Sequence, residues 1–365
     1  MTTSAQIGQL LILGFDGAEM SPPLRTLLTR IQPAGVILFA RNIVGAEQTH
    51  KLLKDCQACV STPLFTCVDL EGGLVDRFRN VLGPTPSAAD VFATSEPRLF
   101  RKHGRVIGDS CRALGFNVDF APVLDLAFEA SRTVMRSRAV SADPKLAVAY
   151  AHEFLAGLKG AGVLGCGKHF PGLGEANLDT HHELPSVAKN QRELWTQDLY
   201  PYRAMRRELP MVLVGHANYP QVTHDLTPAS LSRKWITGVL RGTIGFRGLI
   251  VSDDLEMGGV LKAAPIEQAT VEFIRAGGDL ALLCHLEEGI VRSYEALLQE
   301  AERDRKFARR VKESAARVLA FKKRSSELNR RTPAPTLARV QRISRQLWEL
   351  GERVRIETIK RQVQA

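Results

Sequence analysis

Eight short apolar runs, separated by segments long enough for helices, constrain the fold of this chain more than any other feature. Most of the runs are rich in Val, Ile and Leu and lack an alternation of apolar and polar residues, which is typical of parallel strands covered on both faces. They occupy residues 10–15, 35–39, 64–68, 117–123, 163–167, 211–215, 248–252 and 280–284. Alternating strands and helices predict a parallel α/β fold. Eight repeats predict a single (β/α)8 TIM barrel, which typically takes ~250 residues.

Helical sequence fills the gaps between the runs and continues beyond the last of them. The predicted helices span residues 22–31, 46–61, 97–114, 144–161, 191–209, 230–241 and 265–276. After residue 286 the chain reads as helical to about residue 327, is interrupted by Pro333 and Pro335, and resumes at Thr336. We therefore predict a barrel domain over residues 1–325 and a basic helical extension over residues 326–365. The extra C-terminal helices are expected to pack on the outside of the barrel.

Polar residues follow seven of the eight runs. All strands of a parallel barrel point the same way, so these residues are expected to converge at its C-terminal mouth, where barrel enzymes place their chemistry. The chain has no G-x-G-x-x-G after a strand and no P-loop pattern, so neither nucleotide-binding motif is present. The polar residues at the strand ends are Asp16, Arg41, Asn42, Asp69, Asp125, Lys168, His169, His216, Asn218, Asp253 and Asp254.

Composition bears on the partners of the protein more than on its fold. The formal net charge is +10, but acidic residues are interspersed with the basic ones, and no nucleic-acid motif with interleaved aromatic residues occurs. The alternative of a nucleic-acid-binding function predicts steeply salt-dependent DNA binding. No apolar run approaches the ~20 residues that span a bilayer. We expect a cytoplasmic monomer with no membrane and no nucleic-acid partner.

Several separated motifs, in order along the chain, resemble those of family 3 glycoside hydrolases, specifically the bacterial single-domain β-N-acetylglucosaminidases. The resemblance covers most of residues 7–319. It implies an exo-acting retaining hydrolase that removes terminal non-reducing β-GlcNAc through a covalent glycosyl-enzyme, with GlcNAc-1,6-anhydroMurNAc and its peptides in peptidoglycan recycling as substrates. The motifs are Asp69-Leu-Glu-Gly-Gly, Arg138 ahead of Asp143-Pro144, Lys168-His-Phe-Pro-Gly, Asp179-Thr-His181 and Ser252-Asp253-Asp254-Leu.

The carboxylates at 253 and 254 end a largely apolar run. A strand gives a rigid backbone from which a carboxylate can be aimed at an anomeric carbon, the task of the nucleophile in a retaining glycosidase. The resemblance assigns that role to Asp253, with Asp254 turned away to accept hydrogen bonds from loop or helix amides. The alternative interpretation is that both residues cap the helix that follows, a common role for Asp.

The loop after the fifth run carries the residues that the resemblance assigns to proton transfer. His181 is the predicted acid/base, because a histidine with a reference pKa of ~6.5 donates and accepts protons near neutrality. Asp179, two residues earlier, is expected to orient the ring and stabilise its charged form, as in a catalytic triad. His182 creates an ambiguity of register, which the motif spacing resolves in favour of His181.

The remaining predicted site residues bind sugar hydroxyls. By resemblance Asp69, Arg77, Arg138, Lys168 and His169 bind the sugar in the −1 subsite. The alternative for both arginines is a salt bridge between a loop and the barrel, and Arg136 competes with Arg138 for the motif position. No cofactor is expected, and no metal site, because the carboxylates and histidines lack the spacing of a metal motif.

Two positions depart from the family pattern. Leu173 stands where the family usually has His, and Glu175-Ala176 stands where it has Asp-Thr. Two alternatives on the same frame stay open, a β-glucosidase or a β-glycosyl phosphorylase, the latter because a histidine acid/base carries no negative charge to repel phosphate. Leu173 and Glu175 motivate a third, a sugar-binding protein that has lost turnover. Cleavage of a β-glucoside identifies the first, dependence of cleavage on phosphate identifies the second, and binding without hydrolysis identifies the third.

Overall fold

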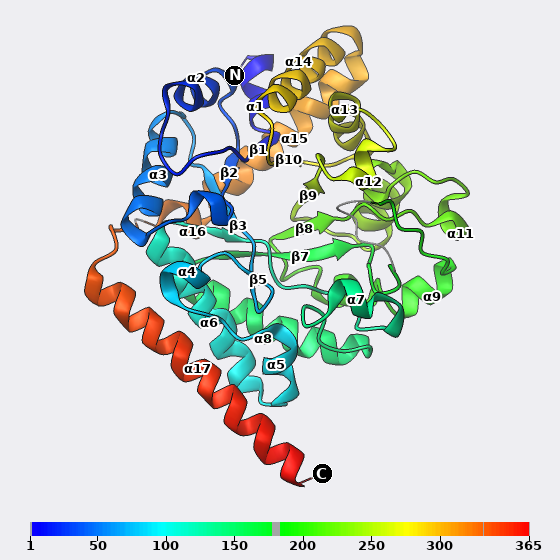
Figure 1. The fold of residues 1–365 in the computed structure, drawn as a ribbon. Helices are drawn as coiled ribbons and strands as arrows, with labels where there is room; N and C mark the ends of the chain where they lie inside the picture. The colour runs from blue at the N-terminus through cyan, green and yellow to red at the C-terminus, as the bar shows by residue number, and fades with distance from the viewer. Residues whose placement is uncertain (1, 177–182, 331, 365) are drawn as a thin grey trace.

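The computed structural model describes residues 2–176, 183–330 and 332–364, and it confirms the barrel. Eight parallel strands close in the order β1, β2, β3, β6, β7, β8, β9, β10, with β10 paired to β1 (Figure 1). Each falls within, or within a few residues of, a predicted apolar run. The strands are β1 (Leu11–Leu13), β2 (Gly35–Ile37), β3 (Phe65–Val68), β6 (Val118–Asp119), β7 (Leu164–Phe170), β8 (Met211–Val214), β9 (Leu249–Asp254) and β10 (Leu280–Leu283).

Helices surround the barrel, and most match their predicted bounds. The predicted helix over residues 191–209 is wrong as a single element, because Pro201 stands in the first turn of a new helix and divides it in two. The helices of the barrel layer are α1 (Thr3–Gly8), α2 (Pro22–Ile31), α3 (Ala46–Ala58), α6 (Pro97–Leu114), α8 (Pro144–Ala161), α9 (Gln191–Thr196), α10 (Tyr200–Met205), the π-helix η4 (Lys234–Thr243), α13 (Ile266–Ala276) and α14 (Glu287–Arg303).

The loops that follow the C-terminal ends of the strands contain several short helices and one short hairpin. The hairpin is an antiparallel pair of β4 (Leu70–Gly72) and β5 (Val75–Asp76), which follows β3 directly and was not predicted. The other short elements are η1 (Ala40–Asn42), α4 (Arg79–Leu82), α5 (Ala88–Ala93), η2 (Glu129–Ser131), α7 (Arg132–Met135), α11 (Pro220–Thr223), η3 (Ala229–Leu231) and α12 (Gly258–Leu261).

The C-terminal helices do more than cover the exterior. The interior of the barrel holds its own apolar cluster, and α15 (Arg305–Arg324) contributes the fully buried Val318 to it, with Phe321 packed alongside. The short α16 (Ser326–Asn329) continues the same closure through Leu328. These helices therefore close the end of the barrel where the strands begin, which corrects the prediction that they all pack outside.

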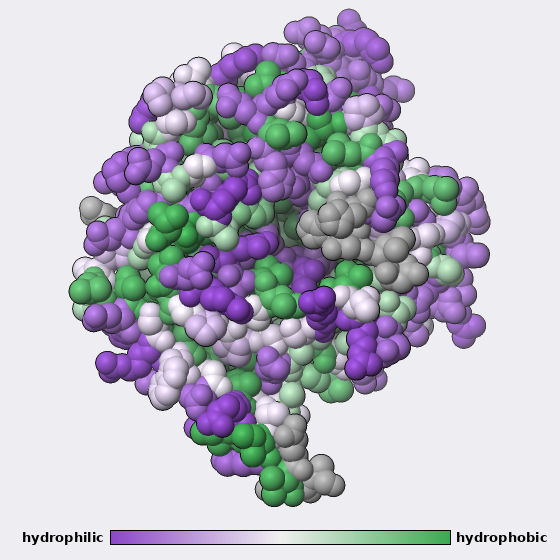
Figure 2. Space-filling view, in the orientation of Figure 1, coloured by the Kyte–Doolittle hydropathy of each residue, from purple (hydrophilic) through white to green (hydrophobic). Residues whose placement is uncertain are grey.

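The last helix, α17 (Leu337–Gln364), crosses the outside of the barrel and projects beyond it (Figure 1). It contacts α4, α5 and α6 and buries Ile343, Leu347, Leu350 and Val354. Figure 2 shows hydrophobic surface on its projecting end. Within the described part of the chain, no helix is both long and apolar enough to cross a membrane.

A buried lysine in α15 makes the stability of the protein depend on pH. Lys322 is 2% exposed; its amino group donates to Gln9 Oε1 at 2.9 Å and lies 5.1 Å from the centre of the Phe65 ring. Among the described residues it has no carboxylate partner, and burial lowers its pKa to about 7. Between pH 7 and the ordinary value of 10.5, the unfolded chain binds a proton that the folded chain does not, so this group makes stability rise with pH.

We expect Lys322→Met to stabilise the protein by about 2 to 3 kcal/mol at pH 6. The lowered pKa corresponds to roughly 4 to 5 kcal/mol of destabilisation below pH 7, and the lost hydrogen bonds offset roughly 1 to 2 kcal/mol. Urea unfolding at pH 6 and pH 10 measures the gain, which should shrink at the higher pH. Lys323→Met, at the exposed neighbour, is the control, and an equal gain in both variants would contradict the explanation.

Candidate active site

The predicted site residues at the strand ends converge on one face of the barrel. Figure 2 shows this face hollowed near its centre, with hydrophilic side chains along the hollow. Asp179, His181 and the competing His182 lie outside the described residues. The structure brings together five of the predicted residues and places Arg77 on the hairpin side of the same mouth; the five are Asp69, Arg138, Lys168, His169 and Asp253.

A buried ion cluster organises one wall of the site around Glu71. The Lys168 amino group lies 2.7 Å from Asp69 Oδ1 and 2.6 Å from Glu71 Oε1. Arg138 meets Glu71 with two parallel bonds, of 2.7 Å from Nε to Oε2 and 2.8 Å from Nη2 to Oε1. Burial alone would raise the pKa of Glu71, but Arg138 and Lys168 hold it far below its ordinary range. Both cations are thereby fixed in position with their charges balanced.

Glu71 reaches this position because the chain reverses directly after it. Gly72 and Gly73 have φ angles of 85° and 60°, and a Cβ on Gly72 would lie 2.2 Å from the Pro86 carbonyl oxygen. The resulting β4–β5 hairpin turns Glu71 toward the barrel axis beside Asp69. Sequence reasoning missed Glu71 as a site residue, although it stands inside the quoted Asp69-Leu-Glu-Gly-Gly motif and its two glycines signal a tight turn.

Asp125 lies in the segment that follows β6, the fourth strand of the barrel, and it fixes the ring of His169. Its Oδ2 lies 2.6 Å from His169 Nδ1, and its Oδ1 accepts from the Leu173 amide at 2.7 Å. Arg138 Nη2 lies 3.4 Å from the other ring nitrogen of His169. The ring is therefore held from both sides by Asp125 and Arg138, so its orientation does not depend on a bound ligand. The sequence marked Asp125 as a strand-end residue without giving it a role.

Asp253 stands at the end of β9 with its carboxylate facing the basic cluster. Burial raises its pKa, but the neighbouring His169 and Lys168 help to outweigh that effect, and the pKa lies below the ordinary value. Asp253 is therefore ionised at neutral pH. Its Oδ1 also accepts from the Asp254 amide at 3.0 Å, which fixes the direction of the side chain.

Asp254 turns away from the site, as predicted. Its Oδ1 accepts from the Glu256 amide at 3.0 Å, and its Oδ2 lies 3.2 Å from His285 Nε2. The N-cap of the following helix α12 is Met257. The alternative in which Asp253 and Asp254 cap that helix is therefore wrong.

His216, after β8, supports the end of β9 that carries Asp253. Its Nε2 lies 2.9 Å from the Asp254 carbonyl oxygen and its Nδ1 lies 2.8 Å from Ser230 Oγ. Burial lowers its pKa, so the ring is neutral. Because a carbonyl only accepts, Nε2 carries the hydrogen, and Ser230 donates to Nδ1. His216 thus fixes the backbone next to Asp253.

The two predicted arginines differ in what holds them. Arg138 forms a salt bridge with Glu71, which is the alternative that the sequence left open for it. The same residue also lies among the other predicted site residues, so the two roles coexist. The Arg77 guanidinium lies 5.8 Å from the centre of the Phe39 ring, and its buried Nε has no hydrogen-bond partner within the described structure. Arg136 is exposed and its Nε bonds only to the Thr133 carbonyl, which favours Arg138 as the motif residue.

The two departures from the family pattern lie at the base of the loop that leads to residue 177. Leu173 is buried near Gly215. Glu175 lies 3.4 Å from the Lys189 amino group, which also pairs with the buried Asp198 at 2.7 Å. Both departures therefore contribute to anchoring the loop on the barrel.

Chemically, the site offers an ionised carboxylate opposite fixed cations and a carboxylate that accepts hydrogen bonds. Among the described residues, no group of His, Cys, Asp and Glu side chains could hold a metal ion. A closed (β/α)8 barrel with charged side chains gathered at the C-terminal ends of its strands has the architecture of a barrel enzyme.

Comparison with known proteins identifies the family to which this barrel belongs. The model of the glycosyl hydrolase family 3 N-terminal domain matches residues 2–321, so the chain belongs to that family and is a glycoside hydrolase. A β-hexosaminidase from Idiomarina loihiensis is 33% identical over 296 residues, which are 80% of this chain and 88% of the relative. A β-hexosaminidase from Alkalilimnicola ehrlichii is 36% identical over 287 residues, 77% and 82% of the two chains.

Solved structures agree with this assignment. A family 3 β-N-acetylglucosaminidase from Paenibacillus sp. superimposes with a TM-score of 0.89 at 31% identity, over 96% of this chain and 69% of that one. A β-N-acetylhexosaminidase from Beutenbergia cavernae gives a TM-score of 0.81 at 26% identity, over 88% and 99% of the two chains.

Proposed function

We propose that this protein is an exo-acting retaining β-N-acetylglucosaminidase that hydrolyses terminal non-reducing β-GlcNAc. The observation that carries the proposal is the ionised Asp253 facing the cluster of Asp69, Arg138, Lys168 and His169. The names of the similar proteins, β-hexosaminidases and a β-N-acetylglucosaminidase, support the N-acetyl preference. We further propose a catalytic domain over residues 1–325 and an extension over residues 326–365.

In the proposed mechanism the sugar in the −1 subsite is held through its hydroxyls by Asp69, Arg77, Arg138, Lys168 and His169. The Asp253 carboxylate attacks C1, and the C1–O bond to the leaving sugar breaks with its electron pair on oxygen. His181, oriented by Asp179, gives that oxygen a proton. It then takes a proton from water, whose oxygen attacks C1 and releases Asp253 as a carboxylate.

The proposed natural substrate is GlcNAc-1,6-anhydroMurNAc or its peptide-bearing form, from peptidoglycan recycling in the cytoplasm, with the enzyme acting as a monomer. The bacterial relatives and the family motifs support this choice.

We expect p-nitrophenyl β-GlcNAc to be hydrolysed about 100-fold faster, in kcat/KM, than p-nitrophenyl β-glucoside, because a site built to bind an amide discriminates strongly against a sugar that lacks it. Adding phosphate should leave the rate and the product unchanged. Release of a glycosyl phosphate would instead identify a phosphorylase. Binding of GlcNAc without turnover of either substrate would identify a protein that has lost its activity.

A further inference from the structure

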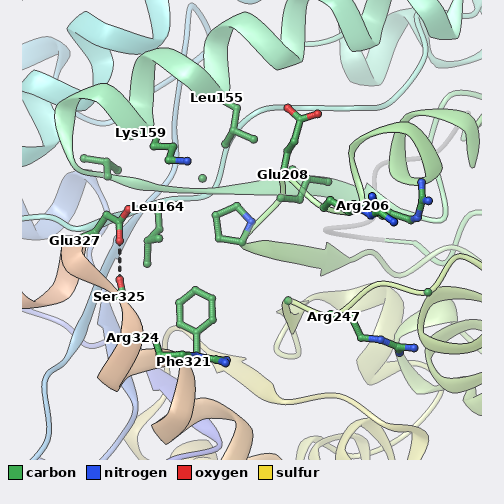
Figure 3. Close-up of a pocket in the computed structure, with 17 residues that line it drawn as sticks. Leu155, Lys159, Leu164, Arg206, Glu208, Arg247, Phe321, Arg324, Ser325 and Glu327 are labelled. Carbon is green, nitrogen blue, oxygen red and sulfur yellow. Dashed lines mark hydrogen bonds between the residues drawn. The ribbon is translucent and has the colours of Figure 1, made fainter.

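Figure 3 shows a pocket of about 700 Å³. It lies where the barrel strands begin, at the end of the barrel opposite to Asp253. The strands that deliver Lys168, His216 and Asp253 to the mouth all begin at this pocket: its wall includes the residues just before or at the start of β7, β8 and β9. The C-terminal end of α15 forms the other side. The proposed function assigns no role to this pocket.

The floor of the pocket is apolar. Leu155, Leu164, Leu209 and Pro210 line it. Figure 3 shows the Phe321 ring pointing toward Leu155 and Leu164. Phe321 is only partly buried, so one part of an aromatic ring is available to a ligand. The volume lies within the range of ~300–1,000 Å³ that is usual for sites that take small molecules.

The rim of the pocket is basic, and its charges are not neutralised by the protein. Lys159, Arg207 and Arg324 line the pocket and make no ion pair with any described carboxylate. Arg206 and Arg247 also line it, and each bonds to a backbone carbonyl, at 2.8 and 3.3 Å.

The two carboxylates of the lining offset only part of the charge of its five cations. Glu208 lies 2.6 Å from His152 Nδ1, and Figure 3 shows its carboxylate pointing away from Phe321. Glu327 accepts hydrogen bonds from the Ser325 and Ser326 hydroxyls, at 2.9 and 3.3 Å. A rim with more cations than carboxylates, above an apolar floor, favours a ligand that joins an anionic group to a flat apolar body.

We propose that this pocket binds a small molecule in which a sugar joins an aromatic base to phosphate groups, the chemistry of a nucleoside diphosphate. The ring would lie against Phe321 and the leucines, and Lys159 and Arg324 would donate charge-assisted hydrogen bonds to the phosphates. The site is made of side chains from α8, α15 and the strand starts. It therefore needs no glycine-rich phosphate loop, and it stands independently of the proposed hydrolysis.

Isothermal titration of the full chain with ADP, adenosine and pyrophosphate tests the proposal. We expect saturable 1:1 binding of ADP, with a Kd about tenfold or more lower than for adenosine or pyrophosphate, because only ADP engages both floor and rim. Equally tight binding of pyrophosphate would overturn the proposal in favour of a simple anion site. Absence of saturable ADP binding would overturn it altogether.

Charge-reversal variants locate the binding. Arg324→Glu and Lys159→Glu should each weaken ADP binding by about tenfold or more, because each removes a phosphate contact and adds repulsion. Lys323→Glu changes the net charge equally one residue away but outside the lining, and should change the Kd by less than about twofold. Equal weakening by Arg324→Glu and Lys323→Glu would show non-specific attraction and overturn the assignment. Circular dichroism and hydrolysis of p-nitrophenyl β-GlcNAc verify that each variant is folded.

Discussion

Asp253→Ala is expected to lower kcat/KM for p-nitrophenyl β-GlcNAc by about 10⁴-fold or more, the usual scale for removal of a nucleophile. The wild-type carboxylate is ionised, because its pKa lies below the ordinary value, with His169 and Lys168 acting against the effect of burial. It stands on a strand whose direction His216 fixes through the Asp254 carbonyl. The loss should appear in kcat, since the side chain is needed chiefly when the bond to C1 forms.

Azide separates a nucleophile from a residue that merely shapes the site. In Asp253→Ala the space next to C1 is free, and azide can attack there while p-nitrophenolate leaves without a proton. The expected product is the α-glycosyl azide, at a rate that rises with azide concentration. Rescue that yields only hydrolysis product, or none in a folded variant, would contradict the role of Asp253.

Asp254→Asn is the matched control for that experiment. The Asn oxygen can still accept from the Glu256 amide, as Asp254 Oδ1 does at 3.0 Å. We expect a loss of less than about 100-fold and no azide rescue. A loss equal to that of Asp253→Ala would instead place the nucleophile at position 254.

Glu71→Gln is expected to destabilise the protein by about 3 to 5 kcal/mol, because it leaves the buried Lys168 and Arg138 with one carboxylate fewer between them. The sign of the pH dependence follows from the direction of the pKa of Glu71, which lies far below its ordinary value of 4.5. This carboxylate contributes stability that is fully present above about pH 4.5 and is lost as the pH falls. The variant should therefore lose less stability than wild type on acidification.

Urea unfolding at pH 7 and pH 4 measures both effects. Glu129→Gln is the control, because Glu129 forms an ion pair with Arg132 in which both side chains are largely exposed; we expect less than about 0.5 kcal/mol there. A Glu71→Gln variant as stable as wild type at pH 7 would show that Asp69 alone balances the two cations.

The sequence predicted the barrel well because strand and helix signals are local. Each of the eight runs is short and mostly apolar, and seven of them are followed by polar residues, so the strands and their common direction could be predicted without any contact between them. The predicted cluster at the mouth follows from the same geometry. Asp69, Lys168, His169 and Asp253 come from three different strands, and parallel strands bring their ends together.

The roles of Glu71 and Asp125 could not be predicted in this way. Glu71 depends on a hairpin of only a few residues, and its two cations lie 67 and 97 residues further along the chain. Asp125 acts through a bond to His169 that no spacing encodes. The inward packing of α15 was also missed, because a helix that closes a barrel and one that lies outside it share the same amphipathic pattern.

Side-chain packing would keep α17 bound to the barrel even after the peptide chain before it had been cut. The segment around Pro333 and Pro335 joins it to the rest of the chain with no helix or strand of its own. After a single proteolytic cut there, α17 would still pack against α4, α5 and α6 through four buried apolar side chains, those of Ile343, Leu347, Leu350 and Val354. Such a nicked protein would migrate as two fragments in denaturing gels and as one particle in solution.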